Sequence, residues 1–191
     1  MAASERHSST LTTGASQFNS NPILGISYLV QHGHVNKGTP ADIARFLHEH
    51  SDQLDKKMVG DYLGSACNAP VLQEYVNAME FQGVAIDAAI RRFLGDLRLP
   101  DESQKIDRIL EKFGERFAVT CASNAEAAFM LAFAVVLLQT DLHSPRVAEA
   151  VKMSKTQFVL ITRDIDDAAF SEDYLGGIYD RIKETPLSLL V

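Results

Sequence analysis

Apolar residues recur three and four positions apart along almost the whole chain, whereas the period-two alternation of β-strands is hard to find. This spacing puts apolar side chains on one face of a helix, so the chain is constrained to helices that pack on a shared core. Its 191 residues are enough for one domain with a real buried interior. We therefore expect an all-α fold of many short helices joined by short loops.

Capping signals predict where the helices begin. Thr39 precedes Pro40, which combines a good N-cap with a proline in the first turn. Ser154 and Gln157 have the spacing of a capping box. The other expected caps are Asp55, Asp101, Ser123 and Ser171. The expected helices cover residues 22–30, 40–47, 55–63, 68–81, 84–97, 125–138 and the segments that follow Asp101, Ser154 and Ser171.

Two segments need separate interpretation. Residues 125–138 are apolar except for Glu126, but they are shorter than the roughly 20 residues that span a bilayer. We interpret them as a central core helix, because a helix that is apolar nearly all round is buried in a soluble fold. Residues 1–17 are rich in Ser, Thr and Ala and have no apolar run typical of a secretion signal. We expect a disordered tail there, followed by one domain over residues 18–191.

Composition excludes several functions. The net charge of −7 argues against nucleic-acid binding, which needs a surplus of Lys and Arg. Cys67 and Cys121 are expected to be small apolar core residues without a disulfide. His48 and His50 lie two positions apart, unlike a zinc pair at i and i+4, so we expect them on a solvated polar face and predict no metal site. No nucleotide-binding glycine loop and no hydrolase nucleophile motif occurs in the sequence.

The functional signal lies in two segments. Residues 97–108 read L-R-L-P-D-E-S-Q-K-I-D-R, and residues 138–145 read L-Q-T-D-L-H-S-P. In the first, Pro100 ends one helix and Asp101 with Gln104 has the capping-box spacing that opens another, which places Glu102 on an exposed loop. In the second, the core helix runs into a polar end and a proline. By spacing alone, both segments are ordinary helix ends.

Together these segments resemble the two signature motifs of the Sec7 domain family, the guanine nucleotide exchange factors for Arf-type GTPases. The family motifs read F-R-L-P-G-E-A-Q-K-I-D-R and L-N-T-D-L-H-N-P. Similar stretches in the same order are Phe18-Asn19 with Pro22 and Gly25-Ile26, residues 39–47, and Gly60-Asp61-Tyr62-Leu63-Gly64. The resemblance covers about residues 18–186.

The resemblance implies a Sec7-type domain of about ten short helices in an elongated superhelical array, with a hydrophobic groove between the motifs. It also implies that the groove binds the switch regions of an Arf-family GTPase. Glu102 matches the family's glutamate finger, which enters the nucleotide site near the β-phosphate and Mg²⁺. The residues implied to contact the GTPase are Leu99, Pro100, Asp101, Gln104, Phe129, Phe133, Val136, Leu137, Thr140, Asp141, His143 and Ser144.

On this interpretation the domain performs no covalent chemistry and has no cofactor of its own, since Mg²⁺ and GDP or GTP belong to the GTPase. We expect a cytoplasmic monomer, peripheral at Golgi or endosomal membranes, that reaches membranes only indirectly through the GTPase or other segments. An alternative is a Sec7-like module that binds a GTPase without productive exchange. A third is a helical scaffold or a hydrolase that uses His48 and His50.

Several departures from the family pattern bear on efficiency. Asp101 replaces a glycine and adds a negative charge beside Glu102, and Leu97 replaces a phenylalanine. Gln139 and Ser144 replace asparagines, which removes a hydrogen bond if those amides order the groove. The loop at residues 164–170 lacks the glycines often found there. Phe133-Ala134 stand where brefeldin-sensitive members carry Tyr-Ser, so we expect resistance to brefeldin A.

Overall fold

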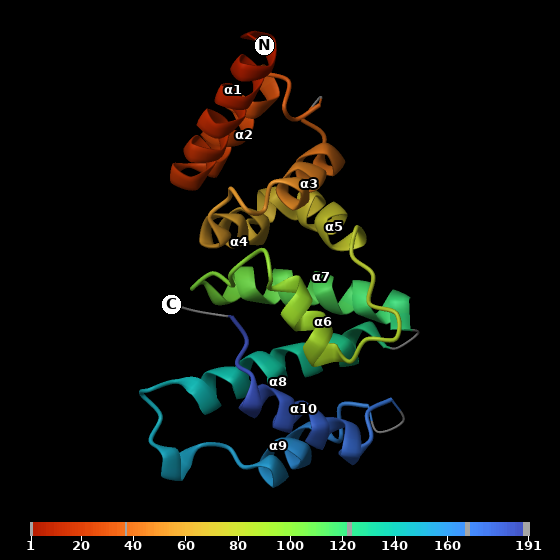
Figure 1. Cartoon of the computed structure of the whole chain (residues 1–191). Coiled ribbons are helices and arrows are strands. Elements are labelled where there is room, and N and C mark those ends of the chain that lie inside the picture. Colours follow the sequence, from red (N-terminus) through yellow and green to blue (C-terminus); the bar gives the residue numbers. More distant parts are fainter. Residues whose placement is uncertain (1, 37, 122–123, 167–168, 189–191) are drawn as a thin grey trace. The chain divides into compact units, whose positions relative to one another are not determined.

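The computed structural model describes residues 2–36, 38–121, 124–166 and 169–188, with side chains from His7 onward. Within these ranges the chain forms ten α-helices and two short 3₁₀-helices, and no strand (Figure 1). The prediction of an all-α fold is therefore confirmed. The chain divides into two compact units, which are described separately: unit 1 contains residues 1–79 and 94–112, and unit 2 contains residues 80–93 and 113–188.

The helices of unit 1 are α1 (Ala2–Ser20), α2 (Pro22–Gln31), α3 (Pro40–Glu49), α4 (Lys56–Gly64), η1 (Ala66–Asn68), α5 (Ala69–Asn77) and the first part of α7 (Ser103–Cys121). Those of unit 2 are α6 (Ile86–Phe93), the remainder of α7, α8 (Ala125–His143), η2 (Glu149–Val151), α9 (Lys155–Thr162) and α10 (Glu172–Glu184). Helices α5 and α6 are shorter than predicted. Residues 78–85 separate them, with Gly83 at a φ of 72°, and α6 ends at Phe93 rather than at residue 97.

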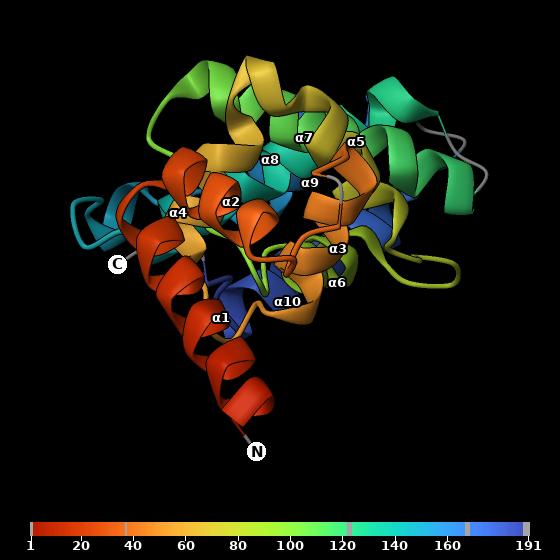
Figure 2. The ribbon, with the colours of Figure 1, turned by 90° about the horizontal axis from the view of Figure 1, so that it is seen from above.

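The expected disordered tail is wrong, because α1 begins at Ala2 and lies beside α2 in both views (Figures 1 and 2). A Cβ atom on Gly14 would lie 2.4 Å from Leu29 Cδ2, and one on Gly25 would lie 2.4 Å from the Phe18 backbone. The two backbones approach this closely only because both positions lack a side chain. Phe18 and Leu29 are fully buried as a result. Small residues that permit close packing carry little apolar signal in the sequence, so periodicity did not reveal this helix.

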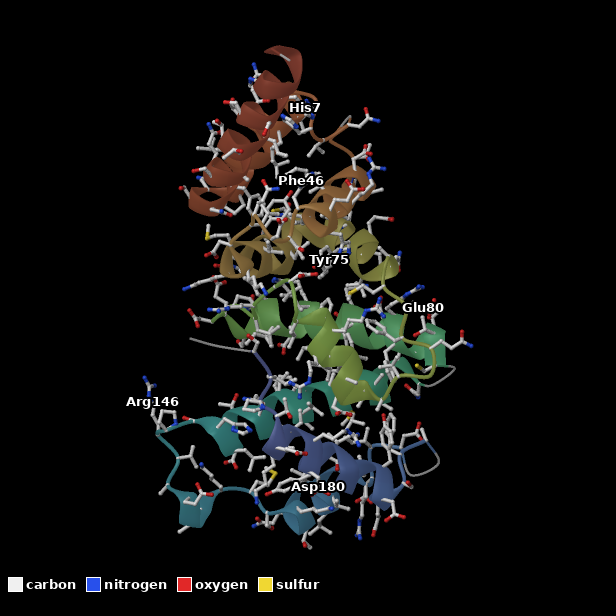
Figure 3. All side chains as sticks on the ribbon, in the orientation of Figure 1. His7, Phe46, Tyr75, Glu80, Arg146 and Asp180 are labelled. Carbon is white, nitrogen blue, oxygen red and sulfur yellow. The ribbon has the colours of Figure 1, made fainter. Side chains whose placement is uncertain are left out.

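Helices α3 and α5 pack together in unit 1, and each contributes a buried aromatic side chain, Phe46 and Tyr75, which are labelled in Figure 3. The ring of His48 stacks on Tyr75 with a centroid separation of 3.8 Å, and its Nε2 lies 2.9 Å from the Tyr75 carbonyl oxygen. His48 is therefore a half-buried packing residue, which corrects the expected solvated face. Burial also raises the pKa of the Tyr75 hydroxyl.

Most of the predicted caps are confirmed. The Asp55 carboxylate accepts a hydrogen bond of 3.0 Å from the Met58 amide, and Ser154 forms a complete capping box with Gln157. Thr39 and Ser171 also accept hydrogen bonds from the first turns of their helices. Helix α8 is capped by Asn124, and the predicted cap Ser123 lies outside the described residues.

Unit 2 is built around α8, against which α6, α9 and α10 pack. Its buried face contains Ala128, Leu131, Ala132, Val135, Leu138 and Leu142. The helix has 19 residues, more than predicted, and by length and composition alone it could cross a membrane. The fully buried face indicates a core helix, so packing rather than shortness supports that interpretation.

Side-chain contacts tie the outer helices of unit 2 together. Arg181 of α10 donates two hydrogen bonds of 2.8 Å to the buried carboxylate of Asp87 in α6. Cys121 is half-buried, and its thiol lies 3.2 Å from the Phe81 carbonyl oxygen. Cys67, in unit 1, is exposed, which corrects the prediction that both cysteines are core residues. Neither cysteine forms a disulfide.

Candidate functional site

The loop that carries the first motif is fixed on α4. The Arg98 amide donates a hydrogen bond of 2.9 Å to the Lys56 carbonyl, and the Lys56 ammonium donates to the Gly95 carbonyl. A Cβ atom on Gly60 would lie 1.7 Å from the Arg98 carbonyl oxygen, so this backbone contact requires a glycine. Within the loop, Leu99 and Pro100 are buried. We call residues 95–102 the finger loop and α4 its platform.

Glu102 is the last residue of the finger loop and immediately precedes α7. Its carbonyl accepts hydrogen bonds from the amides of Lys105, at 2.9 Å, and Ile106, at 3.1 Å. The capping position predicted for Asp101 therefore falls to Glu102, because α7 starts one residue later than expected, at Ser103. The predicted exposure of Glu102 is confirmed, since 69% of its side chain is accessible. Gln104 in the first turn is also exposed.

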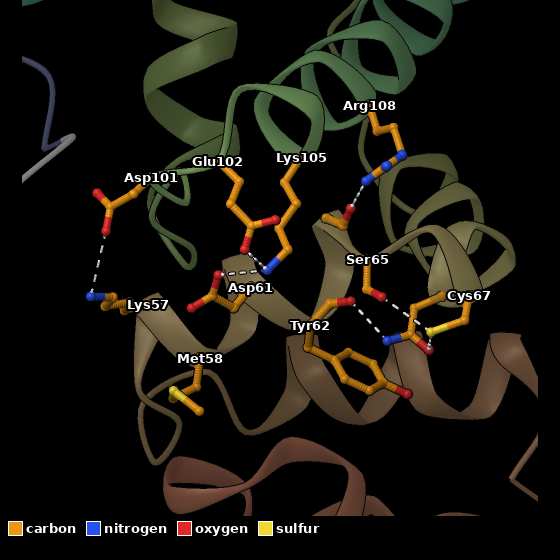
Figure 4. Close-up of polar contacts among 12 residues, drawn as sticks. Lys57, Met58, Asp61, Tyr62, Ser65, Cys67, Asp101, Glu102, Lys105 and Arg108 are labelled. Carbon is orange, nitrogen blue, oxygen red and sulfur yellow. Dashed lines mark hydrogen bonds and ion pairs between the residues drawn. The ribbon is translucent and has the colours of Figure 1, made fainter.

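The charged groups around Glu102 are shown in Figure 4. The Lys105 ammonium lies 2.9 Å from Glu102 Oε1 and 3.2 Å from Asp61 Oδ1 of α4. The Glu102 hydrogen bond, and next the one to Asp61, raise the pKa of Lys105. Asp101 forms a separate, longer ion pair of 3.8 Å with Lys57. The charge that Asp101 adds beside Glu102 is thus partly offset.

Asp61 and Lys105 were missed as site residues by the sequence analysis. Lys105 is three positions after Glu102, a spacing that brings side chains together on a helix, so the pattern could have indicated it. No local signal links Asp61 to Glu102, because they are far apart in the sequence and meet only through the packing of α7 on α4. That packing is tight, since a Cβ atom on Gly64 would lie 2.7 Å from the Lys105 Cβ.

The second motif lies on α8 in unit 2. The predicted contact residues on α8 that precede and begin this motif occupy a different face from the buried one, which distinguishes them from plain core residues. Leu137 is 52% exposed, and Phe129, Phe133 and Val136 are half-buried. Met130, which is 46% exposed, was missed although it precedes Phe133 and Leu137 by three and seven positions. Thr140 extends this face and is exposed.

The polar residues at the end of α8 bond within unit 2. Asp141 accepts a hydrogen bond of 2.6 Å from the Met153 amide, and His143 Nε2 lies 2.8 Å from the Ile182 carbonyl oxygen. Gln139 is buried and accepts a hydrogen bond of 2.7 Å from the Leu187 amide. Gln139 therefore holds the segment after α10. Ser144 ends α8 and accepts a hydrogen bond of 3.2 Å from the Arg146 amide.

The match to known proteins decides the family. The Sec7 domain model matches residues 7–187, nearly the whole chain. The chain belongs to the Sec7 domain family. This Sec7 domain is 42% identical over 185 residues to brefeldin A-inhibited guanine nucleotide-exchange protein 3 of Arabidopsis thaliana. The aligned region covers 94% of the chain and 10% of that protein. It is 40% identical to the human brefeldin A-inhibited exchange protein 1, over 92% of the chain and 10% of that protein. The chain thus spans about a tenth of the length of these relatives.

Solved structures agree with the Sec7 fold. The structure of ARF1-GDP bound to a Sec7 domain with brefeldin A contains a chain that is 28% identical, with a TM-score of 0.91 and coverage of 98% of this chain and 96% of that one. The Sec7p catalytic domain is 35% identical, with a TM-score of 0.83 and coverage of 92% and 97%. In this Sec7 domain, Glu102 and its finger loop belong to unit 1, whereas the exposed face of α8 belongs to unit 2.

Proposed function

We propose that this Sec7 domain is a guanine nucleotide exchange factor for an Arf-family GTPase and that Glu102 destabilises the bound GDP. The observation that carries the proposal is an exposed carboxylate at the end of a loop that is fixed on α4. Relatives named as exchange proteins and a Sec7 domain solved with ARF1-GDP support it. We place the reaction at Golgi or endosomal membranes, which the domain reaches through the GTPase or through other segments.

Electrostatics explains how one carboxylate promotes nucleotide release. A carboxylate about 4 Å from a phosphate charge is repelled by roughly 4 kcal/mol at an effective dielectric near 20. Because each 1.4 kcal/mol corresponds to about a factor of ten, this repulsion is worth roughly three orders of magnitude in affinity for GDP. The carboxylate also competes for the lysine that binds the phosphates in the GTPase. Because the loop backbone is held on α4, only the side chain of Glu102 is free to move near the nucleotide.

We assign contacts with the GTPase to the exposed face of α8 in unit 2 and, separately, to the finger loop in unit 1. Exposed apolar side chains such as Met130 and Leu137 are typical of a surface that binds another protein. Asp141 and His143 support this surface by fixing the end of α8, through their bonds to Met153 and Ile182. Their direct contact with the GTPase stays a prediction.

The test is GDP release from a soluble, N-terminally truncated Arf protein, followed with a fluorescent nucleotide. Wild type should accelerate release strongly, and Glu102→Lys should abolish the acceleration. Glu111→Lys is the matched control, because it makes the same charge reversal at another exposed position of α7. Equal activity of wild type and Glu102→Lys would refute the role of Glu102.

The alternative function is a binding module without productive exchange. The exposed Asp101 side chain beside Glu102 favours it, because a bulky acid in place of glycine changes the charge and flexibility of the finger loop. Binding of Arf-GDP without accelerated release would support this alternative. Recovery of exchange in Asp101→Gly would then identify the residue that prevents it.

A further inference from the structure

Lys105 stands between two carboxylates that come from different parts of unit 1. Its ammonium is 2.9 Å from Glu102 Oε1 and 3.2 Å from Asp61 Oδ1 (Figure 4). The Lys105 side chain is only 20% exposed, and Asp61 is 33% exposed, whereas Glu102 is 69% exposed. Lys105 of α7 and Asp61 of α4 are therefore partly shielded from solvent, whereas Glu102 is mostly exposed.

The packing of α7 on α4 fixes Lys105 but leaves Glu102 free to move. Gly64 lets the aliphatic part of Lys105 lie close to the α4 backbone. In the next turn of α7, Arg108 donates a hydrogen bond of 2.5 Å to the Gly64 carbonyl. Among the described residues, the Glu102 side chain has no polar contact other than its ion pair with Lys105. Rotation of Glu102 about its side-chain bonds breaks one ion pair and disturbs no packing.

The two carboxylates have different effects on Lys105 when Glu102 moves away from it. A carboxylate that acts on a nucleotide must leave its own cation, and a cation left without a partner in a half-buried place would oppose the movement. Asp61 removes that penalty, because Lys105 keeps one carboxylate after Glu102 has left. Without Asp61, Lys105 would hold Glu102 alone and more strongly.

We propose that Asp61 and Lys105 are positioning residues for Glu102: Lys105 holds its carboxylate in the free domain, and Asp61 retains Lys105 when that carboxylate moves to the nucleotide. The inference rests on the proposed exchange function and adds a release step to it. It predicts that Asp61 matters only through Lys105.

The experiment is a double-mutant cycle of Asp61→Asn, Lys105→Gln and the combined variant, measured as exchange on truncated Arf-GDP at several Arf concentrations. Asp52→Asn is the matched control, because it removes the same charge at an exposed position of unit 1. Thermal unfolding of every variant checks that the fold is retained.

We expect Asp61→Asn to lower kcat by about three- to fivefold, the factor that a partly exposed ion pair can supply, with KM nearly unchanged. In the Lys105→Gln background the same substitution should have no effect, because no cation is left to hold Glu102. Wild-type kcat in Asp61→Asn would overturn the inference. An equal loss in both backgrounds would also overturn it, since that result indicates a purely structural Asp61.

A second measurement separates this inference from the exchange function. The ¹⁵N resonance of the Lys105 ammonium in the free domain should shift in Glu102→Gln and in Asp61→Asn, but not in Asp52→Asn. An inactive wild type would refute the proposed exchange function, and the resonance would still report whether Lys105 is shared. A resonance that neither variant moves would overturn the inference whatever the exchange activity.

Discussion

Asp101 and Glu102 are adjacent acids whose surroundings differ. Asp101 is 83% exposed and has a distant partner in Lys57, whereas Glu102 forms a close pair with Lys105. Surface ion pairs of the first kind contribute at most about 1 kcal/mol, so Asp101 is held weakly. The second pair belongs to a group of three charges on a packed helix interface. The two acids therefore differ in how strongly a neighbouring lysine holds their carboxylates, although both are exposed.

Brefeldin sensitivity is also a question for single residues. Phe133 lies on the partly exposed face of α8 and is followed by Ala134. Brefeldin-sensitive family members carry Tyr-Ser at these two positions, so the resemblance implies resistance to the drug. We expect exchange by wild type to continue at drug concentrations that stop sensitive domains, although relatives of this chain are named as brefeldin A-inhibited. Fluorescent GDP release measured with and without the drug tests this. The double variant Phe133→Tyr with Ala134→Ser should gain sensitivity, and a wild type slowed sharply by the drug would contradict the prediction.

The element that organises the candidate site is α4. It receives the finger loop at Gly60 and the first turns of α7 at Gly64. Both contacts join a glycine to a segment that lies later in the chain. Helix α4 thus admits both segments at close range because two of its positions have no side chain.

Gly60→Ala should disrupt this platform. The new Cβ would lie 1.7 Å from the Arg98 carbonyl oxygen, so the finger loop must move away from α4. We expect a loss of about 1–3 kcal/mol in the free energy of unfolding, typical of overpacking, measured by chemical denaturation. Exchange should fall at least about tenfold, since small misplacements of a reactive group are costly. As the control, Gly177→Ala in α10 places its Cβ atom 3.0 Å from Arg181 Nη1, a side-chain atom rather than backbone, and should change stability by no more than about 1 kcal/mol.

The α1–α2 pair should respond to pH. The rings of His7 and His34 lie 4.2 Å apart, and partial burial, followed by the charges of His7, His32 and His50, lowers the pKa of His34 below its ordinary 6.5. The folded chain therefore binds a proton at His34 less readily than the unfolded chain does. The free energy of unfolding is therefore unaffected by His34 above about pH 6.5, and it decreases as the pH falls below that value.

This predicted pH dependence is measurable by denaturation at about pH 7.5 and about pH 5.5. The free energy of unfolding should fall toward the lower pH in wild type. His34→Gln, which keeps a partner for the Thr10 hydroxyl found 2.8 Å from the ring, should show a smaller fall. Identical pH profiles for the two proteins would exclude His34 as the cause.

At the scale of the whole molecule, the question is where the domain begins. The family match starts at residue 7, and α1 packs on α2 through Gly14, Ala15 and Phe18. A domain that starts at residue 18, as the motifs alone suggested, would leave one face of α2 uncovered. The domain therefore includes most of the segment that composition presented as a tail.

Truncation tests this boundary. Removal of residues 1–6 should leave the free energy of unfolding within about 0.5 kcal/mol of the full chain. Removal of residues 1–17 should lower it by at least about 2 kcal/mol, because Leu29 and its neighbours on α2 lose their cover. Equal stability of the two shortened chains, measured by denaturant unfolding, would mean that α1 contributes nothing to the core.

The sequence by itself determined the helical class, most of the caps, the family and the exposed position of Glu102. These features depend on neighbours in the chain, because capping and helical periodicity are local. Only the tertiary structure revealed α1 as a packed helix, the half-buried place of His48 and the sharing of Lys105 between Asp61 and Glu102. Each of these depends on a close approach between distant segments, and local patterns cannot encode such an approach. Asp61 shows this most directly, because its role depends on the fit of α7 against Gly64.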